Sequence, residues 1–365
     1  MQGKVVDFPG TAEIIRELAD SPVGDRALSG PGRLLLASLQ ASAAEIARIS
    51  ANINETVAAV VDATTPTSQL VGNLARDLIP RWHFAMLNDI ERNGALATAV
   101  ERQVKPGDHV LDIGAGTGLL AMMAANAGAA KVISCEANPL MAEIATQVVA
   151  AHGLSDVITV VAKRSDELVV GRDLERPVDV IVSEIVDCGL IGEGIMPTMR
   201  HAREHLLAPG GILMPPSARI HGALLQSPVI AGLNEVHNAC GFDIGVLNTL
   251  STVGHFPVRL HTWPHTLLSE ATELVTFDFV HGSLDDGSTP VALTATADGT
   301  VHGVVAWFDM DLGAGVVLRN APDNKSSHWM QAMIPLAEPI EVVAGQPVKF
   351  DFVWESGRLS VSSVS

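Results

Sequence analysis

The sequence is poor in several kinds of residue, and each scarcity excludes a class of protein. Its 23 lysines and arginines stand against 41 acidic residues, which gives a formal net charge of −18. Because nucleic-acid binding relies on clustered basic side chains, we expect no nucleic-acid partner. The sequence has no run of about 18 apolar residues and no signal-peptide pattern at its N-terminus. We therefore expect a cytoplasmic protein that makes no membrane contact.

Cysteine is also scarce. Cys135, Cys188 and Cys240 are widely spaced and follow neither a disulfide pattern nor a metal-ligand pattern. We expect three reduced thiols and no metal. Hydrophobic residues make up 47% of the 365 residues and charged residues 18%, which is typical of a globular chain long enough for two domains. The acidic balance favours a cationic substrate, although it also serves solubility.

A strand followed by a glycine-rich turn organises the chain. Val110 to Ile113 is a short apolar run, three alternating glycines follow it, and Leu119 to Ala130 is expected to be a helix. A second strand, Lys131 to Cys135, ends directly before Glu136, a side chain suited to accept hydrogen bonds from ribose hydroxyls. This order predicts half of a doubly wound nucleotide-binding fold.

The spacing within the turn points to the ligand. Gly114, Gly116 and Gly118 depart from the Gly-x-Gly-x-x-Gly spacing of dinucleotide folds, and no lysine follows them to bind a phosphate. Asp112, just before the turn, suits the ammonium group of an amino-acid-like ligand. The combination resembles the first motif of S-adenosylmethionine-dependent methyltransferases. A glycine turn without any ligand is the alternative.

The sequence pattern changes at Pro215-Pro216. Before this point the pattern alternates between helix and strand, and from Ser217 strand-like runs are separated by turn residues, which indicates an antiparallel β domain. We expect an α/β domain over 81–215 and a β-barrel-like domain over 216–365. The elements expected before the change are one helix from Arg81 to about Gln103, a helix from Pro139 to His152, strands from Ile158 to Ala162 and Val178 to Ser183, a helix from Thr198 to Leu206, and a strand from Gly211 to Met214.

The first 80 residues are expected to form a separate helical region. Pro31 to Ala63 has the pattern of one long helix, and short helices are expected at Ala12 to Ala19 and Ser68 to Leu78. Apolar residues recur every seven positions along the long helix. This repeat favours packing against another helix, either in the same chain or in a second copy. Its members are Leu39, Ile46, Ile53 and Val60.

The strand from Val178 to Ser183 runs into a loop that carries Glu184 and Glu193. Ligands of open α/β sheets lie outside the carboxyl ends of the strands, so Glu184 should stand beside the glycine turn. Two carboxylates next to a methyl donor favour a cationic acceptor. The guanidinium of arginine fits, because it is planar, always protonated and offers parallel N–H donors. Two glutamates that only solvate a loop are the alternative.

Four separated motifs together resemble the protein arginine methyltransferases, over about residues 81 to 355. The glutamate-containing loop and the later His-Trp-Met-Gln stretch are most similar to the type III, monomethylating branch. The resemblance implies a Rossmann-like class I methyltransferase domain followed by a β-barrel domain, S-adenosylmethionine as the methyl donor, and a homodimer. The motifs are Met86 to Asn93, Asp112 to Gly118, Ser183 to Gly194 and Ser327 to Gln331.

The resemblance also implies roles for individual residues. Arg92 would bind the cofactor carboxylate and Asp166 the adenine amino group, while His328 would pair with Asp89 to hold a helix over the site. Glu184 and Glu193 would clamp the guanidinium. The implied cofactor-binding set is His83, Met86, Arg92, Asp112, Gly114, Gly116, Gly118, Glu136 and Asp166; the catalytic set is Glu184, Glu193, His328 and Asp89; the acceptor-side set is Asp187, Trp329 and Gln331.

The chain departs from the family pattern in two places. It contains no tyrosine, so Trp82, His83 and Phe84 replace the tyrosine-rich start of the cofactor lid. The segment at about 243–275, where the family inserts its dimerisation arm, is short. Dimerisation through this arm and dimerisation through the N-terminal helices are both open.

The substrate is the remaining question. The chain resembles stand-alone members of the family that methylate free L-arginine in bacterial natural-product pathways, such as the route to streptozotocin. We therefore expect a single methyl group to be placed on free L-arginine. Arginine within a protein or peptide is the second reading, and an inactive cofactor-binding scaffold is a remote third.

Overall fold

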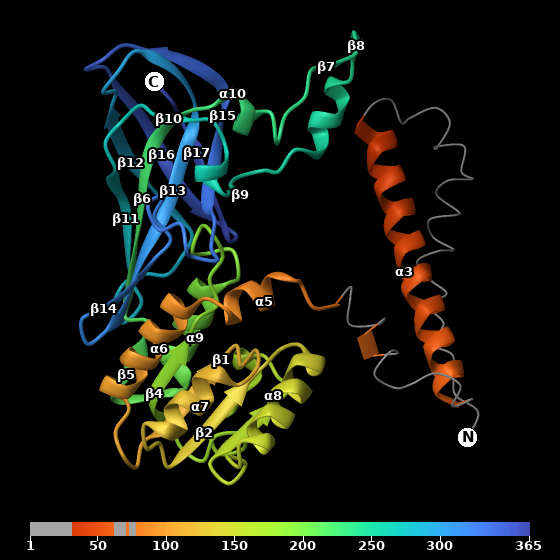
Figure 1. The fold of residues 1–365 in the computed structure, drawn as a ribbon, viewed down its shortest axis with the longest axis vertical. Coiled ribbons are helices and arrows are strands. Elements are labelled where there is room, and N and C mark those ends of the chain that lie inside the picture. Colours follow the sequence, from red (N-terminus) through yellow and green to blue (C-terminus); the bar gives the residue numbers. More distant parts are fainter. Residues whose placement is uncertain (1–30, 62–70, 73–77) are drawn as a thin grey trace. The chain divides into compact units, whose positions relative to one another are not determined.

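A computed structural model describes residues 31–61, 71–72 and 78–365 (Figure 1). The chain divides into two units, Met1–His83 and Phe84–Ser365. The helix expected at Ala12 to Ala19 lies outside the described residues, and most of the one expected at Ser68 to Leu78 does so as well.

The first unit contains the long helix α3 (Pro31–Val61), which begins at the expected residue. The two further residues of the prediction, 62 and 63, lie outside the described part. Leu39, Ile46, Ile53 and Val60, the members of the seven-residue repeat, are between 41% and 58% exposed. The helix therefore presents an apolar stripe along its length.

Two helices, α5 (Trp82–Leu87) and α6 (Ile90–Gln103), replace the single helix that the sequence predicts to continue from residue 81 to about 103. Asp89 interrupts it with an extended backbone (φ −77°, ψ 95°). Its side chain accepts a hydrogen bond from the Arg92 N–H and so caps α6. The prediction of one helix is wrong because this cap starts a new one.

The parallel sheet has the predicted doubly wound arrangement. Its strand order is β3-β2-β1-β4-β5, and every neighbouring pair is parallel. The order reverses between β1 and β4, so the segments that follow these two strands meet at the switch point where such folds bind ligands. The strands are β1 (His109–Ile113), β2 (Lys131–Cys135), β3 (Ile158–Val161), β4 (Val178–Ser183) and β5 (Leu207–Met214).

The helices of this part match their predictions except at their ends. α7 (Leu119–Asn126) stops before the expected Ala130 because Gly128 takes a left-handed φ of +105°. α9 (Ile195–His205) starts earlier than Thr198, directly after Gly194 with φ +84°. The other elements are α8 (Pro139–Ala151) and the 3-10 turn η1 (Ser165–Glu167).

After Pro215-Pro216 all strand pairing between the named strands is antiparallel, as expected. The fold is therefore a Rossmann-like domain followed by curled antiparallel sheets. One sheet contains β6 (Ser217–Gln226), β9 (Phe256–Val258), β10 (Thr266–Leu267), β11 (Thr272–Asp278), β13 (Gly299–Gly313), β14 (Val316–Arg319) and β15 (Gln331–Val342), and another contains β12 (Gly287–Thr294), β16 (Pro347–Glu355) and β17 (Arg358–Ser362).

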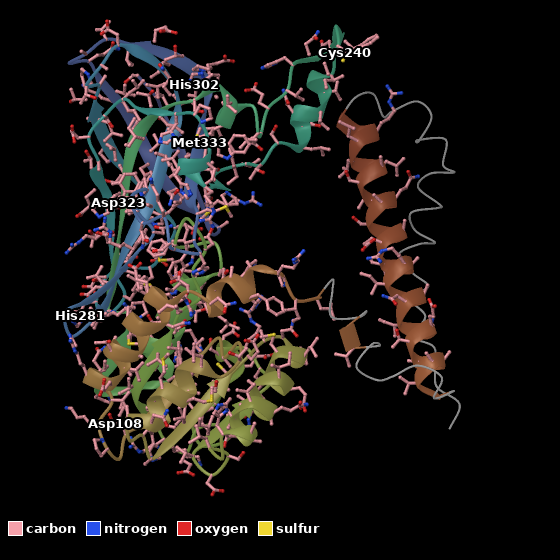
Figure 2. The ribbon with its side chains drawn as sticks, viewed as in Figure 1. Asp108, Cys240, His281, His302, Asp323 and Met333 are labelled. Carbon is pink, nitrogen blue, oxygen red and sulfur yellow. The ribbon has the colours of Figure 1, made fainter. Side chains whose placement is uncertain are left out.

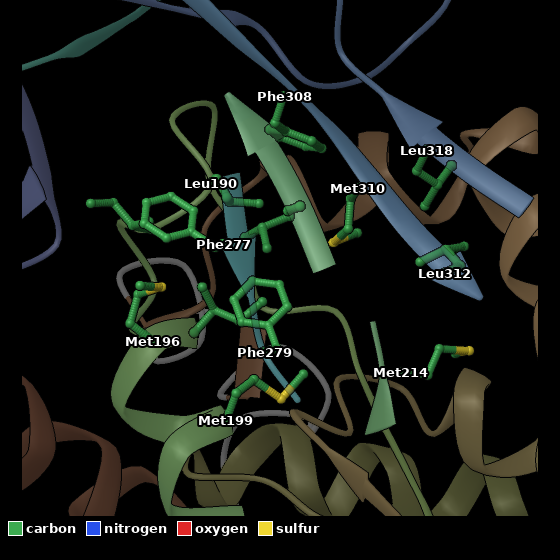
Figure 3. Packing of buried hydrophobic residues seen from close by; sticks show 14 of the residues in the cluster. Leu190, Met196, Met199, Met214, Phe277, Phe279, Phe308, Met310, Leu312 and Leu318 are labelled. Atoms are coloured by element: carbon green, nitrogen blue, oxygen red, sulfur yellow. The ribbon is translucent and has the colours of Figure 1, made fainter. Parts of the chain in front are cut away.

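A single hydrophobic cluster crosses from the parallel sheet to the antiparallel ones (Figure 3). Met199 of α9, Phe279, which directly follows β11, and Phe308 of β13 are fully buried in it. Burial of one phenylalanine contributes about 1.5–3 kcal/mol. Leu190, from the loop after β4, is also fully buried there. The loop that carries the two glutamates is thus anchored in the core shared by both parts.

Residues 232–255 leave the sheet and extend outward between α10 (Pro228–Ala231) and β9 (Figure 1). We call them the projecting segment; Cys240 lies near its tip (Figure 2). The dimerisation arm predicted at about 243–275 overlaps the projecting segment only in its first part. β10 and β11, which lie in the later part of the predicted range, pair with β6 and so belong to the sheet. The projecting segment contains β7 (Asn238–Ala239), β8 (Phe242–Asp243) and η2 (Gly245–Leu250), and η3 (Leu260–Thr262) follows it after β9.

In the described part of the chain, no helix combines the length and the apolar character that a bilayer crossing requires.

Candidate active site

The glycine turn after β1 leaves its backbone accessible on one side and packed on the other. Gly114, Gly116 and Gly118 all have left-handed φ values, of +83°, +53° and +81°. A Cβ on Gly114 would lie 2.5 Å from Cγ2 of Ile185, so only glycine fits there. A Cβ on Gly116 would meet no atom within 4 Å. A ligand can therefore approach the backbone at Gly116 closely.

Asp112, at the end of β1, has an unused oxygen inside the protein. Its Oδ2 accepts a hydrogen bond of 2.7 Å from Ser134 Oγ, while Oδ1 is buried and has no partner among the described residues. Burial, and to a smaller extent the nearby charge of Glu136, together raise the pKa of this carboxyl to about 7, although the hydrogen bond from Ser134 lowers it. A buried polar atom without a partner costs about 1–3 kcal/mol. A positively charged ammonium group is the chemistry that would satisfy it.

Glu136 is held rigidly beside the same turn. Its Oε2 accepts from the Gly116 N–H at 3.0 Å and its Oε1 from the Asn138 N–H at 2.8 Å. Each carboxylate oxygen has a further acceptor site, which suits the two hydroxyls of a ribose. Asp112, Gly116 and Glu136 together fit the methionine and ribose parts of S-adenosylmethionine.

The predicted cofactor set also contains Asp166, Met86 and His83. Asp166, in η1, is exposed, and its carboxylate accepts from Arg164 Nε at 3.1 Å, an interaction that lowers the pKa of Asp166. Met86 is partly buried in α5. His83 belongs to the first unit, where its Nδ1 lies 2.9 Å from the Pro80 carbonyl.

Glu184, directly after β4, holds a guanidinium group of the protein itself. Its Oε2 accepts from Arg92 Nε at 2.7 Å and also from Arg92 Nη2, and both side chains are at most 6% exposed. Burial raises the pKa of Glu184, and the charge and hydrogen bonds of Arg92 counteract part of this effect. The sequence assigned the two residues to different ligands, whereas the structure pairs them with each other. Glu184 is therefore oriented to receive the N–H fork of an arginine.

Glu193 is the second acid of the glutamate loop, the name used here for residues 184–193. It keeps an exposed edge, and no described residue hydrogen-bonds to its carboxylate. Loss of water on its inner side raises its pKa to about 7, with further contributions from Glu184 and Asp187. Two acids with raised pKa on one loop are typical of a functional site.

Trp329, which was predicted to lie on the acceptor side, packs against the glutamate loop and holds it by a hydrogen bond. Its Nε1 donates to the Val186 carbonyl at 3.2 Å, and its ring packs edge-on against Phe308 with centroids 5.3 Å apart. Asn320 Nδ2 donates to the Cys188 carbonyl at 3.0 Å. Asn320 is fully buried and was missed by the sequence analysis, since no motif contains it.

Gln331, also predicted on the acceptor side, is a buried support as well. Its Nε2 donates to the Asn320 carbonyl at 2.8 Å, and its Oε1 accepts from the Leu260 N–H at 3.2 Å. The amide is committed to backbone partners at both ends. Its effect on an acceptor would therefore act through the backbone it holds.

The expected contact between Asp89 and His328 is present. Asp89 Oδ2 accepts from the backbone N–H of His328 and lies 2.9 Å from its Nδ1. Burial alone would raise the pKa of Asp89, but hydrogen bonds from Arg92 and His328 outweigh it and lower the value. Burial lowers the pKa of His328. Arg259, which the sequence analysis missed, donates to the carbonyls of Ser327 and His328.

Asp187 was expected to bind the acceptor, and in the structure both of its oxygens contact the protein. Oδ1 accepts from the Gly192 N–H at 2.8 Å, and Oδ2 lies 2.8 Å from Nε2 of His255. His255 is the last residue of the projecting segment, and no local pattern marks it in the sequence. The partner of Asp187 is thus visible only once the chain is folded.

Two family descriptions match the chain, one on each side of Pro215-Pro216. Residues 218–360 match the arginine methyltransferase oligomerization subdomain. Residues 95–214 match the ribosomal protein L11 methyltransferase family. Both parts of the second unit therefore have methyltransferase counterparts.

Two curated proteins illustrate the range of similar sequences. An Arginine N(omega)-methyltransferase of Streptomyces achromogenes subsp. streptozoticus is 51% identical over 346 residues, which covers 95% of this chain and 96% of that protein. Protein arginine N-methyltransferase 7 of Oryza sativa subsp. indica is 36% identical over 264 residues, covering 66% of this chain and 36% of the rice protein. The first match is end to end, whereas the second takes in little more than a third of the relative.

Solved structures agree with these matches. The Trypanosoma brucei PRMT1 enzyme-prozyme complex with AdoHcy superimposes with a TM-score of 0.66 at 28% identity, covering 74% of this chain and 86% of that one. Arabidopsis thaliana protein arginine methyltransferase 10 has the same fold, with a TM-score of 0.61 at 24% identity. The chain belongs to the arginine N-methyltransferase family, whose methyl donor is S-adenosylmethionine.

Proposed function

We propose that the protein transfers one methyl group from S-adenosylmethionine to a terminal guanidinium nitrogen of free L-arginine and forms Nω-monomethyl-L-arginine. The observation that carries this proposal is the pairing of Glu184 with the guanidinium of Arg92 beside the glycine turn. It supports a site built to hold a guanidinium next to a methyl donor. Arg92 then turns to the carboxylate of the bound cofactor.

Glu184 and Glu193 hold the acceptor in this proposal. A guanidinium and a sulfonium about 4 Å apart repel each other by about 4 kcal/mol at an effective dielectric constant of about 20, and two carboxylates offset this repulsion. Hydrogen bonds to the carboxylates fix the acceptor nitrogen in line with the methyl group, and such orientation lowers a barrier by up to about 7–11 kcal/mol. S-adenosylmethionine supplies a methyl group on positively charged sulfur and leaves as S-adenosylhomocysteine.

The proton released in the reaction also needs an acceptor. As the N–CH₃ bond forms and the S–CH₃ bond breaks, the guanidinium nitrogen loses one proton and the product keeps its single positive charge. Glu193, with its pKa near 7 and an exposed edge, is suited to take this proton and pass it to water. Asp89 and His328 hold α6, and with it Arg92, in place during the reaction.

Free arginine is favoured because the end-to-end match is to a protein named Arginine N(omega)-methyltransferase. A bacterial natural-product pathway, similar to the route to streptozotocin, is the setting we propose. The match to the rice protein supports arginine within a protein or peptide as the second candidate. An inactive scaffold is disfavoured, since both glutamates and the glycine turn are present.

We also propose a homodimer formed through the projecting segment, with the α3 helix as the alternative contact. The projecting segment falls within the match to an oligomerization subdomain and carries exposed apolar side chains. A cytoplasmic location is proposed from the three unpaired cysteines, which suit a reducing compartment.

Mass spectrometry tests the reaction directly. Purified protein is incubated with S-adenosylmethionine and either free L-arginine or an arginine-glycine-rich peptide, beside a Glu184→Gln variant. A gain of one methyl on free arginine, absent in the variant, supports the proposal. Methylation of the peptide alone supports the second candidate. Dimethylarginine as a major product, or more than about a tenth of the activity left in Glu184→Gln, would contradict the assignment, because one transition-state contact is worth about 10²–10³-fold.

A further inference from the structure

We propose that His255 is a positioning residue that holds the glutamate loop through Asp187 and joins this loop to the base of the projecting segment. The inference rests on the proposed function, in which the loop holds the guanidinium. His255 lies 68 positions from Asp187 along the chain. Its side chain is 6% exposed, although it ends a segment that otherwise extends into solvent.

The contact fixes the middle of the loop. His255 Nε2 lies 2.8 Å from Asp187 Oδ2, and Asp187 Oδ1 accepts from the Gly192 N–H at 2.8 Å. Gly192 directly precedes Glu193. The imidazole therefore sets, through one carboxylate, the backbone position from which the second acid of the clamp projects.

Two glycines of the loop show how closely these groups pack. A Cβ added to Gly189 would lie 2.5 Å from His255 Nε2, and a Cβ added to Gly192 would lie 2.4 Å from Asp187 Oδ2. At either position a side chain would fit only if the imidazole or the carboxylate moved away. The glycines at these two positions are explained by the imidazole and the carboxylate that fill the space above them.

The other ring nitrogen of His255 reaches a different element. The Leu359 N–H, in β17, donates to His255 Nδ1 at 3.0 Å, so Nδ1 carries no proton and Nε2 is the donor to Asp187. Asp187, Cys188 and His255 also have the ligand types of a metal site. A metal at Nε2 would need that nitrogen free of its proton while Leu359 occupies the other one. The hydrogen-bond pattern therefore favours a structural contact over a metal site. We call the hydrogen bond from His255 Nε2 to Asp187 Oδ2 the latch.

The latch connects two regions with different tasks. Gly254, one residue earlier, has a left-handed φ of +85°, and a Cβ there would lie 3.0 Å from the Leu359 carbonyl. The base of the projecting segment is thus seated on β17 at the same point where His255 reaches the glutamate loop. Loss of this contact is therefore expected to change the position of Glu193 and to loosen the base of the projecting segment.

Steady-state kinetics of a double-mutant cycle tests the latch, using His255→Ala, Asp187→Asn and both changes together. His261→Ala is the matched control, because His261 is an exposed histidine six residues further on. Misplacement by about 1 Å costs up to about 100-fold in rate, so we expect kcat with free arginine to fall about 10- to 100-fold in each single variant. The double variant is expected to lose little more than His255→Ala, since both changes break one contact.

Two further measurements separate positioning from general damage. The affinity for S-adenosylhomocysteine, measured by calorimetry, is expected to stay within about twofold of wild type, because the glycine turn is untouched. His255→Gln, whose amide N–H can still donate to Asp187, is expected to restore part of kcat. Hydrogen exchange of residues 186–194 and of the base of the projecting segment is expected to speed up in His255→Ala and not in His261→Ala.

The outcomes distinguish the latch from the proposed function. Wild-type kcat and exchange rates in His255→Ala, together with an inactive Glu184→Gln, would overturn the latch and leave the proposed function standing. Methylation of the peptide alone would overturn the proposed substrate, and more than about a tenth of the activity left in Glu184→Gln would overturn the role of Glu184 in holding the guanidinium. Faster exchange of the loop in His255→Ala would support the latch in either case. One equivalent of zinc per chain, lost in His255→Ala, would replace the latch by a metal site.

Discussion

One oxygen of Asp89 meets His328 twice, at the backbone N–H and at Nδ1, with both distances 2.9 Å. The other oxygen accepts from the Arg92 N–H at 2.9 Å and caps α6. A separation of 239 positions is thus bridged by one buried carboxylate. This bridge fixes the helix that carries Arg92 against the segment that leads into β15.

We expect Asp89→Ala to lower the free energy of unfolding by about 2–4 kcal/mol. Loss of a helix cap costs about 1 kcal/mol, and leaving the buried N–H of His328 without a partner costs about 1–3 kcal/mol more. Urea denaturation of the purified variant measures the change. Asp323→Ala is the control, since its exposed pairing with Arg319 is worth at most about 1 kcal/mol. Equal effects of the two changes would contradict this account of Asp89.

Removal of Arg92 is expected to be costly in a different way. Arg92→Met leaves the buried carboxylate of Glu184 without its partner, which costs about 3–5 kcal/mol at neutral pH. The double variant Arg92→Met, Glu184→Gln removes both charges and is expected to be more stable than Arg92→Met alone. Thermal and urea unfolding at one pH give both values. If the double variant were the less stable of the two, the pair would not be the source of the cost.

The sequence was most informative where local patterns determine the structure. The order of strand, glycine turn, helix and strand from β1 to β2, and the change of pairing at Pro215-Pro216, follow from apolar runs and turn residues within a few positions. The switch point then follows from topology alone, so Glu184 and the glycine turn were correctly expected near each other. The order of strands in the antiparallel part was not predicted, since it depends on long-range pairing such as β6 with β13.

The parts that were missed depend on contacts between distant positions. Three residues that belong to no sequence motif contact the glutamate loop or the segment before β15. They are His255, Asn320 and Arg259. Asp89 was recognised for its partner, yet its capping of α6, which breaks the predicted long helix, was overlooked. The pairing of Arg92 with Glu184 was also unexpected, because each residue had been matched to a ligand and not to the other.

The pH dependence of the reaction should report on Glu193. Its pKa is raised to about 7, and a protonated carboxyl no longer attracts the guanidinium. We expect kcat/KM for arginine, at saturating S-adenosylmethionine, to fall as the pH drops through about 7, since this ratio follows the free enzyme. Glu235→Gln, which changes an exposed acid of the projecting segment, is expected to keep the same profile. A profile that stays flat well below pH 7 would contradict the role of Glu193.

Asp112→Asn should separate stability from cofactor binding. The folded-state pKa of Asp112 is about 7, above the ordinary value of about 3.9, so the folded wild type holds a proton that the unfolded chain has lost between these values. Wild-type stability therefore declines as the pH rises through this window, and the variant is expected to lose this decline. Its affinity for S-adenosylhomocysteine is expected to fall about 10- to 100-fold, the value of a hydrogen bond to a charged group. Urea unfolding at several pH values and calorimetry test the two effects, and an unchanged affinity would remove Asp112 from the cofactor site.

The projecting segment should determine the oligomeric state. Apolar side chains exposed together on a segment that leaves the sheet are typical of a protein interface, and Phe242 and Leu250 are 73% and 71% exposed. We expect Leu250→Asp to convert a dimer into a monomer in light scattering coupled to size-exclusion chromatography, because a buried charge opposes association. Val317→Asp, which changes a lone exposed apolar residue on β14, is the control and should leave the dimer intact. A dimer that survives Leu250→Asp and dissociates when Ile46 and Ile53 are both changed to Asp would place the contact on α3, along the exposed stripe of its seven-residue repeat.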